Sequence, residues 1–209
     1  MASSGRQAEI LDGLEDIFLR DGFRRASVGS LAARLHCSRR ALYELASSKQ
    51  DLFVLVLDRL LRRIRELGDA AAESASTLQD RIEAYLAPGI SGVRRATPSF
   101  AADLAELPEA KRVFDEHQRL RMAGLRSIIA DALERGIARG FDPQLVADIL
   151  SIAYRRASEP DFLAETKLSL TEAYREIGQL LCHGLLHPAD DRVGTARRQR
   201  AVRERRARR

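Results

Sequence analysis

The 209-residue sequence predicts an all-α fold, and three observations support it. Apolar residues recur every three or four positions along most of the chain. Serine, threonine and proline stand where helices typically begin, and glycine stands where they typically end. No segment shows the sustained alternation of apolar and polar residues that marks a strand. We therefore expect about nine helices, with a small N-terminal group joined by a long helix to a larger helical domain.

The first two helices are marked by their apolar spacing and by a cap. Apolar residues at helical spacing run from Ile10 to Phe18, and Gly22 then ends the first helix. Ser27 is a suitable N-cap for a short second helix that runs to Leu35. The two helices are thus separated by only a few residues.

A three-residue turn leads to the third helix, which Ser38 caps and which extends from Arg39 to about residue 46. Ser48 and Asp51 form a predicted capping box for a long fourth helix. We expect that helix to end in the small-residue run at 69–77.

Five more helices are predicted in the larger domain. Thr97 and Pro98 mark the start of one of them, and Asp142 and Pro143 mark another. The predicted ranges are about 77–87, 98–106, 108–135, 142–156 and 169–186. The arginine-rich segment 189–209 is low in complexity and is expected to be disordered.

Cysteine content and hydropathy indicate the compartment. Cys37 and Cys182 are too few for a disulfide framework, and no signal-peptide pattern opens the sequence. The longest strongly apolar run, which begins at Leu52, is interrupted by charged residues well short of a membrane span. We expect a cytoplasmic protein without a membrane partner.

The net charge of +5 is unevenly distributed. Residues 192–209 hold nine arginines and one glutamate, so the rest of the chain is slightly acidic. Within that remainder, residues 21–49 hold six basic and two acidic side chains. Such a patch indicates a polyanionic partner, although a solvated helical surface is the commoner explanation for any single run of arginines.

The third helix has two different faces. At about 100° per residue, Arg39, Arg40 and Tyr43 fall on one side, while apolar residues fall on the other. Both arginines lie at the N-terminal end, where the helix dipole favours an anion. A helix of this size fits the major groove of DNA, and arginine is well shaped to bind guanine there. Together with the preceding helix and turn, this pattern predicts a helix-turn-helix motif.

Residues Ile10 to Phe53 resemble the N-terminal DNA-binding domain of the TetR repressor family. The resemblance is carried by "DGF" at the end of the first helix, "SVGSLA" in the second, "SRRALY" in the third and "SKQDL" at the start of the fourth. It covers about the first quarter of the chain. It implies that the recognition helix binds DNA bases through Arg39 and Arg40, and that phosphates are contacted by Ser27, Ser38, Tyr43 and Lys49.

Four positions depart from the family pattern. His36 stands where glycine usually makes the turn, and Cys37 where valine is common. Leu45 replaces a usual histidine and Ala46 a usual phenylalanine. Because histidine tolerates positive φ better than most residues, we expect an intact turn. We expect these departures, and the acidic Glu44 beside them, to affect the affinity for DNA more than the fold.

By the same resemblance, the larger domain forms a ligand cavity and a dimer interface. Apolar walls with a few polar groups are typical of such cavities, although ordinary core packing produces the same composition. The expected pocket residues are Phe100, Leu104, Phe114, His117, Met122 and Tyr154. The last two regular helices would form a four-helix interface across a two-fold axis, and the alternative is that their apolar residues belong to the intrachain core. These residues are Leu145, Ile149, Ile152, Ile177, Leu180, Leu181 and Leu185.

Metal binding and catalysis find less support. His183 and His187 stand four residues apart and could hold zinc, but no further ligand at fixed spacing completes a structural site. We therefore favour a role at the end of the final helix. No nucleophile, nucleotide-binding or redox motif is present in the sequence. We expect no metal, no cofactor and no enzymatic activity.

Three domains follow from these observations: a helix-turn-helix DNA-binding domain at 1–53, a helical ligand-binding and dimerisation domain at 54–188, and the tail at 189–209. The predicted function is that of a homodimeric transcriptional repressor, released from double-stranded DNA by a small-molecule effector. Three alternatives remain from the sequence: a helical interaction protein with a degenerate helix-turn-helix, a non-specific nucleic-acid binder, and a small helical enzyme.

Overall fold

The computed structural model describes residues 2–92, 96–135, 142–157 and 159–186, and these residues form helices and connecting turns with no strand. The predicted all-α fold is thus confirmed for the described part of the chain. In order, the helices are α1 (Ala2–Asp21), α2 (Val28–Arg34), α3 (Arg39–Tyr43), α4 (Lys49–Glu73), α5 (Leu78–Gly92), α6 (Pro98–Glu106), α7 (Pro108–Glu134), α8 (Pro143–Ala157), α9 (Pro160–Thr166) and α10 (Leu170–Leu186).

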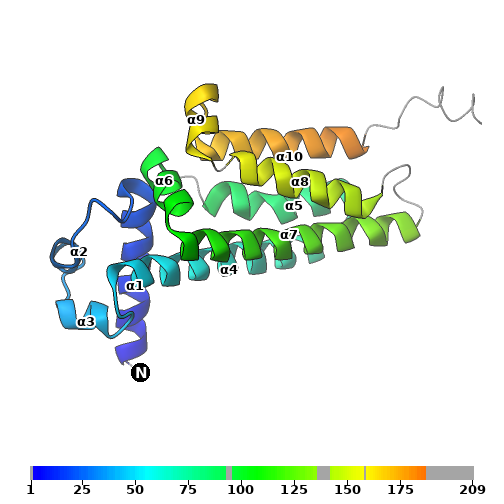
Figure 1. Cartoon of the computed structure of the whole chain (residues 1–209). Helices are drawn as coiled ribbons and strands as arrows, with labels where there is room; N and C mark the ends of the chain where they lie inside the picture. The colour runs from blue at the N-terminus through cyan, green and yellow to red at the C-terminus, as the bar shows by residue number, and fades with distance from the viewer. Residues whose placement is uncertain (1, 93–95, 136–141, 158, 187–209) are drawn as a thin grey trace, which may run out of the picture.

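The helices form two groups (Figure 1). Helices α1, α2 and α3 lie together at one end of the molecule, around the beginning of α4. Helices α5, α7, α8 and α10 extend away from this group alongside the rest of α4, and α6 lies next to the C-terminal end of α1. The residue 53/54 boundary that we predicted between the domains falls inside α4.

A cluster of phenylalanines joins the two groups. The ring of Phe53 on α4 stacks on Phe23, with 4.7 Å between the ring centroids. Phe18 and Phe100 meet the same ring edge-on, at 5.6 Å and 5.8 Å. All four are buried, and such aromatic pairs add to the stability gained from burial alone. Because Phe100 belongs to α6, the larger domain contributes directly to the core of the N-terminal group.

Two expectations about helix number and length are corrected. Helix α9 lies between the predicted ranges 142–156 and 169–186, where no helix was expected. Proline is favoured in the first turn of a helix, and Pro160 starts α9 in this way, while Lys167 ends it with a φ of 57°. Helix α5 was expected to stop near residue 87 but continues through Pro88 to Gly92, since a proline removes one hydrogen bond and does not have to end a well-packed helix.

Smaller differences concern the ends of two helices. Helix α1 begins at Ala2, before the apolar pattern that predicted it. Helix α3 ends at Tyr43, and the chain continues as a hydrogen-bonded turn in which the N–H of Ala46 donates to the Leu42 carbonyl at 3.2 Å. The caps at Ser27, Ser38, Ser48 and Thr97 all form as predicted.

Candidate nucleic-acid interface

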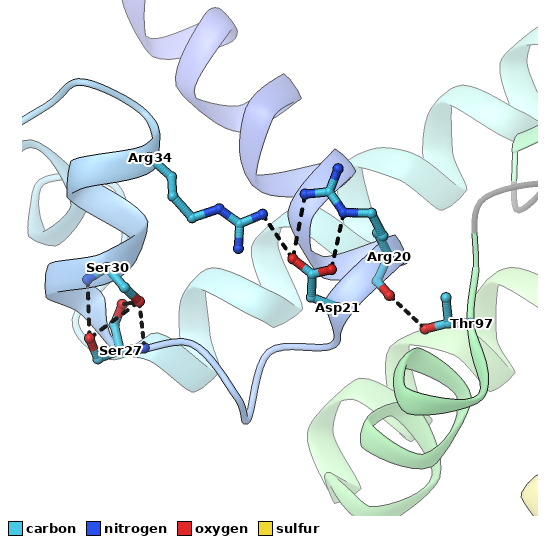
Figure 2. A network of polar contacts seen from close by, with 6 residues as sticks. All are labelled: Arg20, Asp21, Ser27, Ser30, Arg34 and Thr97. Carbon is cyan, nitrogen blue, oxygen red and sulfur yellow. Dashed lines mark hydrogen bonds and ion pairs between the residues drawn. The ribbon is translucent and has the colours of Figure 1, made fainter.

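The start of α2 is fixed by two serines. The N–H of Ser30 donates to Ser27 Oγ at 3.1 Å, and the N–H of Ser27 donates to Ser30 Oγ at 2.9 Å (Figure 2). This reciprocal capping box satisfies two amides that the helix itself leaves unpaired. Ser27 is therefore already engaged with the backbone, and its hydroxyl lies at the exposed N-terminal end of α2.

The turn between α2 and α3 forms without a glycine. His36 adopts a φ of 49°, the N–H of Cys37 donates to the Ala32 carbonyl at 3.0 Å, and the N–H of His36 donates to Ala33 at 3.3 Å. This pair of bonds is the Schellman arrangement that normally ends a helix. Arg6 on α1 supports the turn from outside by donating to the His36 carbonyl at 2.9 Å. The prediction of an intact turn at His36 is confirmed.

Helix α3 has the two predicted faces. Leu42 is completely buried, whereas Tyr43 is 53% exposed and the side chain of Arg40 is 87% exposed. Ser38 caps the helix by accepting a hydrogen bond from the N–H of Ala41 at 3.0 Å. An apolar contact with the core thus holds α3, while polar side chains at its start point to solvent.

The two arginines of α3 have different surroundings. The guanidinium of Arg39 lies against Gly29 on α2, so closely that a Cβ at position 29 would stand 2.8 Å from Nη2. Arg40 Nε instead donates to Glu44 Oε1 at 3.0 Å, one turn further along. Because both members of that ion pair are exposed, the pair is weak and leaves Arg40 available for a stronger partner.

Lys49 takes part in the structure of the domain itself. Its ammonium donates to the carbonyls of Ala26 at 2.8 Å and Arg24 at 3.2 Å. It also lies 5.3 Å from the centroid of the Phe23 ring, a distance typical of cation–π contacts. Two of its three N–H donors are thus used inside the protein, and its phosphate contact stays a prediction.

Charged side chains also connect α1 to α2. Asp21 accepts hydrogen bonds from Arg20 at 3.0 Å and from Arg34 on α2 at 2.8 Å (Figure 2). The hydrogen bond from Arg20, followed by that from Arg34, lowers the pKa of Asp21 below its ordinary value. Asp21 therefore stays ionised and holds α2 against the end of α1.

Helix α6 holds the turn that follows α1 in place. The sequence did not predict the contacts that do this. Asp103 is only 5% exposed and accepts hydrogen bonds from the N–H groups of Phe23 at 2.6 Å and Arg24 at 3.3 Å. Just before α6, Thr97 donates through its N–H to the Leu19 carbonyl at 3.0 Å and through Oγ1 to the Arg20 carbonyl at 2.9 Å (Figure 2). No local sequence signal could have found these contacts between distant residues.

The six predicted pocket residues are buried, and those with printed contacts touch different parts of the core. Phe100 packs on Phe53, and Tyr154 meets the ring of Tyr174 at 4.8 Å. His117 Nε2 lies 2.9 Å from Asp58 Oδ1, while its Nδ1 lies 3.2 Å from Arg65 Nη1. A hollow of about 310 Å³ between α5 and α10 is lined by other residues, among them Leu86, Ile90, Arg175 and Gly178. The predicted pocket stays a prediction.

The predicted dimerisation helices carry an exposed apolar stripe. Leu145, Ile149 and Ile152 on α8 are each more than half exposed, and Leu180 on α10 is 74% exposed. Ile177 is partly buried against the core of its own chain. The side chains of Leu181 and Leu185 lie outside the described residues. The four exposed side chains therefore do not belong to the intrachain core, whereas Ile177 does in part, and the dimer interface stays a prediction.

The side chain of His183, the residue His187 and the predicted tail at 189–209 lie outside what the structure describes, so the zinc alternative is not tested. Within the part of the chain that the structure describes, no three side chains of the metal-binding types come together. None of the described helices combines the length and the hydropathy needed to cross a membrane.

The N-terminal segment is similar to a known protein family. Residues 10–56 match the family model described as "Bacterial regulatory proteins, tetR family". This range contains α2, α3 and most of α1. No curated protein matches the chain at a significant level.

Solved structures share the fold over nearly the whole chain at low sequence identity. A transcriptional regulator from Saccharomonospora viridis in complex with choline has a TM-score of 0.69 at 13% identity, covering 88% of this chain and 100% of that one. A TetR/AcrR-family regulator from Thermobifida fusca has a TM-score of 0.62 at 22% identity, covering 86% and 98%. FadR from Bacillus subtilis in complex with stearoyl-CoA has a TM-score of 0.62 at 14% identity, covering 85% and 98%.

Proposed function

We propose that the protein is a homodimeric transcriptional repressor released from DNA by a small molecule, and the match of residues 10–56 to the TetR family model supports this proposal. The observation that carries the proposal is the arrangement of α3, whose buried Leu42 fixes a helix that displays Arg40 and Tyr43. We assign DNA binding to residues 1–53 and effector binding and dimerisation to residues 54–188.

Base reading is assigned to Arg39 and Arg40. A guanidinium can donate two parallel hydrogen bonds to O6 and N7 of guanine in the major groove. Arg40 would break its exposed ion pair with Glu44 and bind such a guanine instead. Arg39 would reach DNA from the side of α3 that faces Gly29. Ser27, Ser38, Tyr43 and Lys49 are assigned to phosphates, which fix the position of the protein on the duplex.

Dimerisation is assigned to the apolar stripe of α8 and α10. Exposed leucine and isoleucine side chains at helical spacing favour a helical partner, and a two-fold axis would bring the same stripe of a second chain against them. Two α3 helices would then face half-sites about one helical turn apart on DNA.

Release by an effector is supported by the contacts between α6 and the N-terminal group. Asp103 and Thr97 fix the end of α1 to the larger domain, so a ligand that shifts α6 or α4 would also shift α3. An effector that changes the separation of the two α3 helices would lower affinity for paired half-sites. The similar structures named above hold choline and stearoyl-CoA, and this supports a ligand-binding role for the larger domain here.

Titration against DNA tests the proposal. The full-length protein is titrated with the DNA upstream of its own gene and with a scrambled sequence, at two salt concentrations. We expect preference for the upstream DNA, and a loss of about 5- to 150-fold in specific affinity for Arg39→Ala or Arg40→Ala. Arg112→Ala is the matched control, since Arg112 is exposed on α7 and pairs with Glu109 on the same helix.

Other outcomes separate the alternatives. Equal affinity for both DNAs would favour a non-specific nucleic-acid binder, to which the arginine-rich tail would contribute a strong salt dependence. No affinity for either would favour an interaction protein or an enzyme. An unchanged preference in both arginine variants would remove Arg39 and Arg40 from base reading.

A further inference from the structure

We propose that the larger domain binds an organic carboxylate through Arg121 and Gln118 on α7. This inference rests on the proposed ligand-regulated function and names the chemical class of the effector. Its basis is a buried arginine for which the described residues provide no ion pair, next to a buried amide without an acceptor.

Arg121 is a buried cation without a counter-ion. It is only 3% exposed, and its guanidinium has no hydrogen bond or ion pair among the described residues. The backbone of Arg121 is satisfied, because the hydroxyl of Tyr85 donates to its carbonyl at 2.7 Å. On the same helix, the exposed Arg112 and Arg119 both pair with glutamates. Burying a charge is costly unless a partner compensates it, so Arg121 differs from a structural arginine.

Gln118, one turn earlier on α7, is also buried and, among the described residues, also lacks a hydrogen-bond partner for its amide nitrogen. It is 5% exposed, and its Nε2 is fully buried with no acceptor in the described part of the chain. Residues three apart on a helix lie on the same face, so Gln118 and Arg121 occupy neighbouring positions on α7. The guanidinium and the amide could donate to the two oxygens of one carboxylate, and charge-assisted bonds of this kind are among the strongest in proteins.

A glycine on α5 makes room for the guanidinium. A Cβ at Gly89 would stand 2.5 Å from both Nη atoms of Arg121, so the charged group lies directly against the backbone of α5. Any larger residue at position 89 would force Arg121 to move.

The charged groups that act on Tyr85 are Arg121, Asp69 and Arg65, so two positive charges stand against one negative charge near this part of α7. Asp58 is already bound by His117 and Arg62, and Arg65 on α4 adds a second positive charge beside His117. Tyr85 supplies no negative charge, because burial raises its pKa to about 12. The buried face of α7 is otherwise apolar and includes Phe114, Met122 and Leu125. A cation among apolar side chains favours a carboxylate with an apolar body.

Thermal unfolding of the full-length protein tests the inference. The probes are acetate, benzoate and octanoate, each compared with its neutral amide of nearly the same shape. We expect at least one carboxylate to raise the Tm by about 2–4 °C more than its amide does. The gain should be absent in Arg121→Gln and kept in the matched control Arg119→Gln, which changes an exposed arginine of the same helix.

A second variant covers the case in which Arg121→Gln does not fold. Gly89→Ala keeps the arginine but displaces its guanidinium, so it should also lose the response. The inference is overturned if no carboxylate exceeds its amide in the wild type, or if the gain persists in both Arg121→Gln and Gly89→Ala.

DNA titration of the same preparations separates this inference from the proposed function. A protein that prefers its upstream DNA but responds to no carboxylate refutes the effector class alone. If the protein responds to a carboxylate through Arg121 but shows no DNA preference, the result supports the carboxylate site. It then refutes the proposed repressor function.

Discussion

The carboxylate of Asp103 accepts a hydrogen bond of 2.6 Å from the backbone N–H of Phe23, which lies 80 positions earlier in the chain. The same carboxylate lies 3.4 Å from Arg24 Nε. One buried side chain of α6 therefore fixes the turn between α1 and α2, and the placement of the helix-turn-helix depends on the larger domain.

Asp103→Ala should lower the free energy of unfolding by about 1–3 kcal/mol, because it leaves a buried N–H without its acceptor. Urea denaturation measures this loss. Glu106→Ala is the matched control, since Glu106 also pairs with Arg24 but is exposed, and it should cost less than about 1 kcal/mol. Equal losses in the two variants would contradict a special role for Asp103.

The contribution of Asp21 should depend on pH. Its pKa is lowered in the folded protein by hydrogen bonds from Arg20 and Arg34, so it stabilises the fold above the unfolded value of about 3.9 and loses this effect as the pH falls through the folded pKa. Asp21→Asn should cost less than about 1 kcal/mol at pH 7, since the pair is partly exposed. The gap between wild type and variant should close below about pH 4. Urea denaturation at pH 7, 4 and 3 checks this, and a gap that widens in acid would refute it.

His36→Gly should stabilise the protein. His36 holds a φ of 49°, a conformation that costs other residues about 1–2 kcal/mol and glycine much less. After the extra flexibility of glycine in the unfolded chain is subtracted, we expect a gain of about 0.5–1 kcal/mol in the free energy of unfolding. Ala33→Gly, in the regular part of α2, should change it by a similar amount in the opposite direction. A loss in His36→Gly would mean that the imidazole itself supports the turn.

Ile149→Glu should convert a dimer into a monomer at micromolar concentration. The side chain is 57% exposed in the single chain, so the variant should fold normally while placing a charge in the proposed interface. Light scattering coupled to size exclusion measures the mass. Leu67→Glu is the control, because Leu67 is similarly exposed but lies on α4. A dimeric Ile149→Glu protein would place the interface elsewhere.

The features predicted correctly from the sequence are those that local residues determine. Ser27, Ser38 and Thr97 begin helices through bonds to residues three positions away, and such spacing is visible in a sequence. The two faces of α3 follow from helical periodicity in the same way. What the sequence could not reveal depends on distant contacts, such as those of Asp103 with the turn after α1 and of Arg121 with Gly89.

Helix α4 begins at Lys49, whose ammonium binds the carbonyls of Arg24 and Ala26, and its 25 residues extend into the larger domain. At 1.5 Å per residue it is roughly 37 Å long. It can therefore serve as a lever arm: a tilt of about 5° around its far end displaces its first turn by about 3 Å. The carbonyl contacts of Lys49 would carry the start of α2 along, so a rotation too small to disturb the packing of the bundle is enough to misalign an arginine with its base pair.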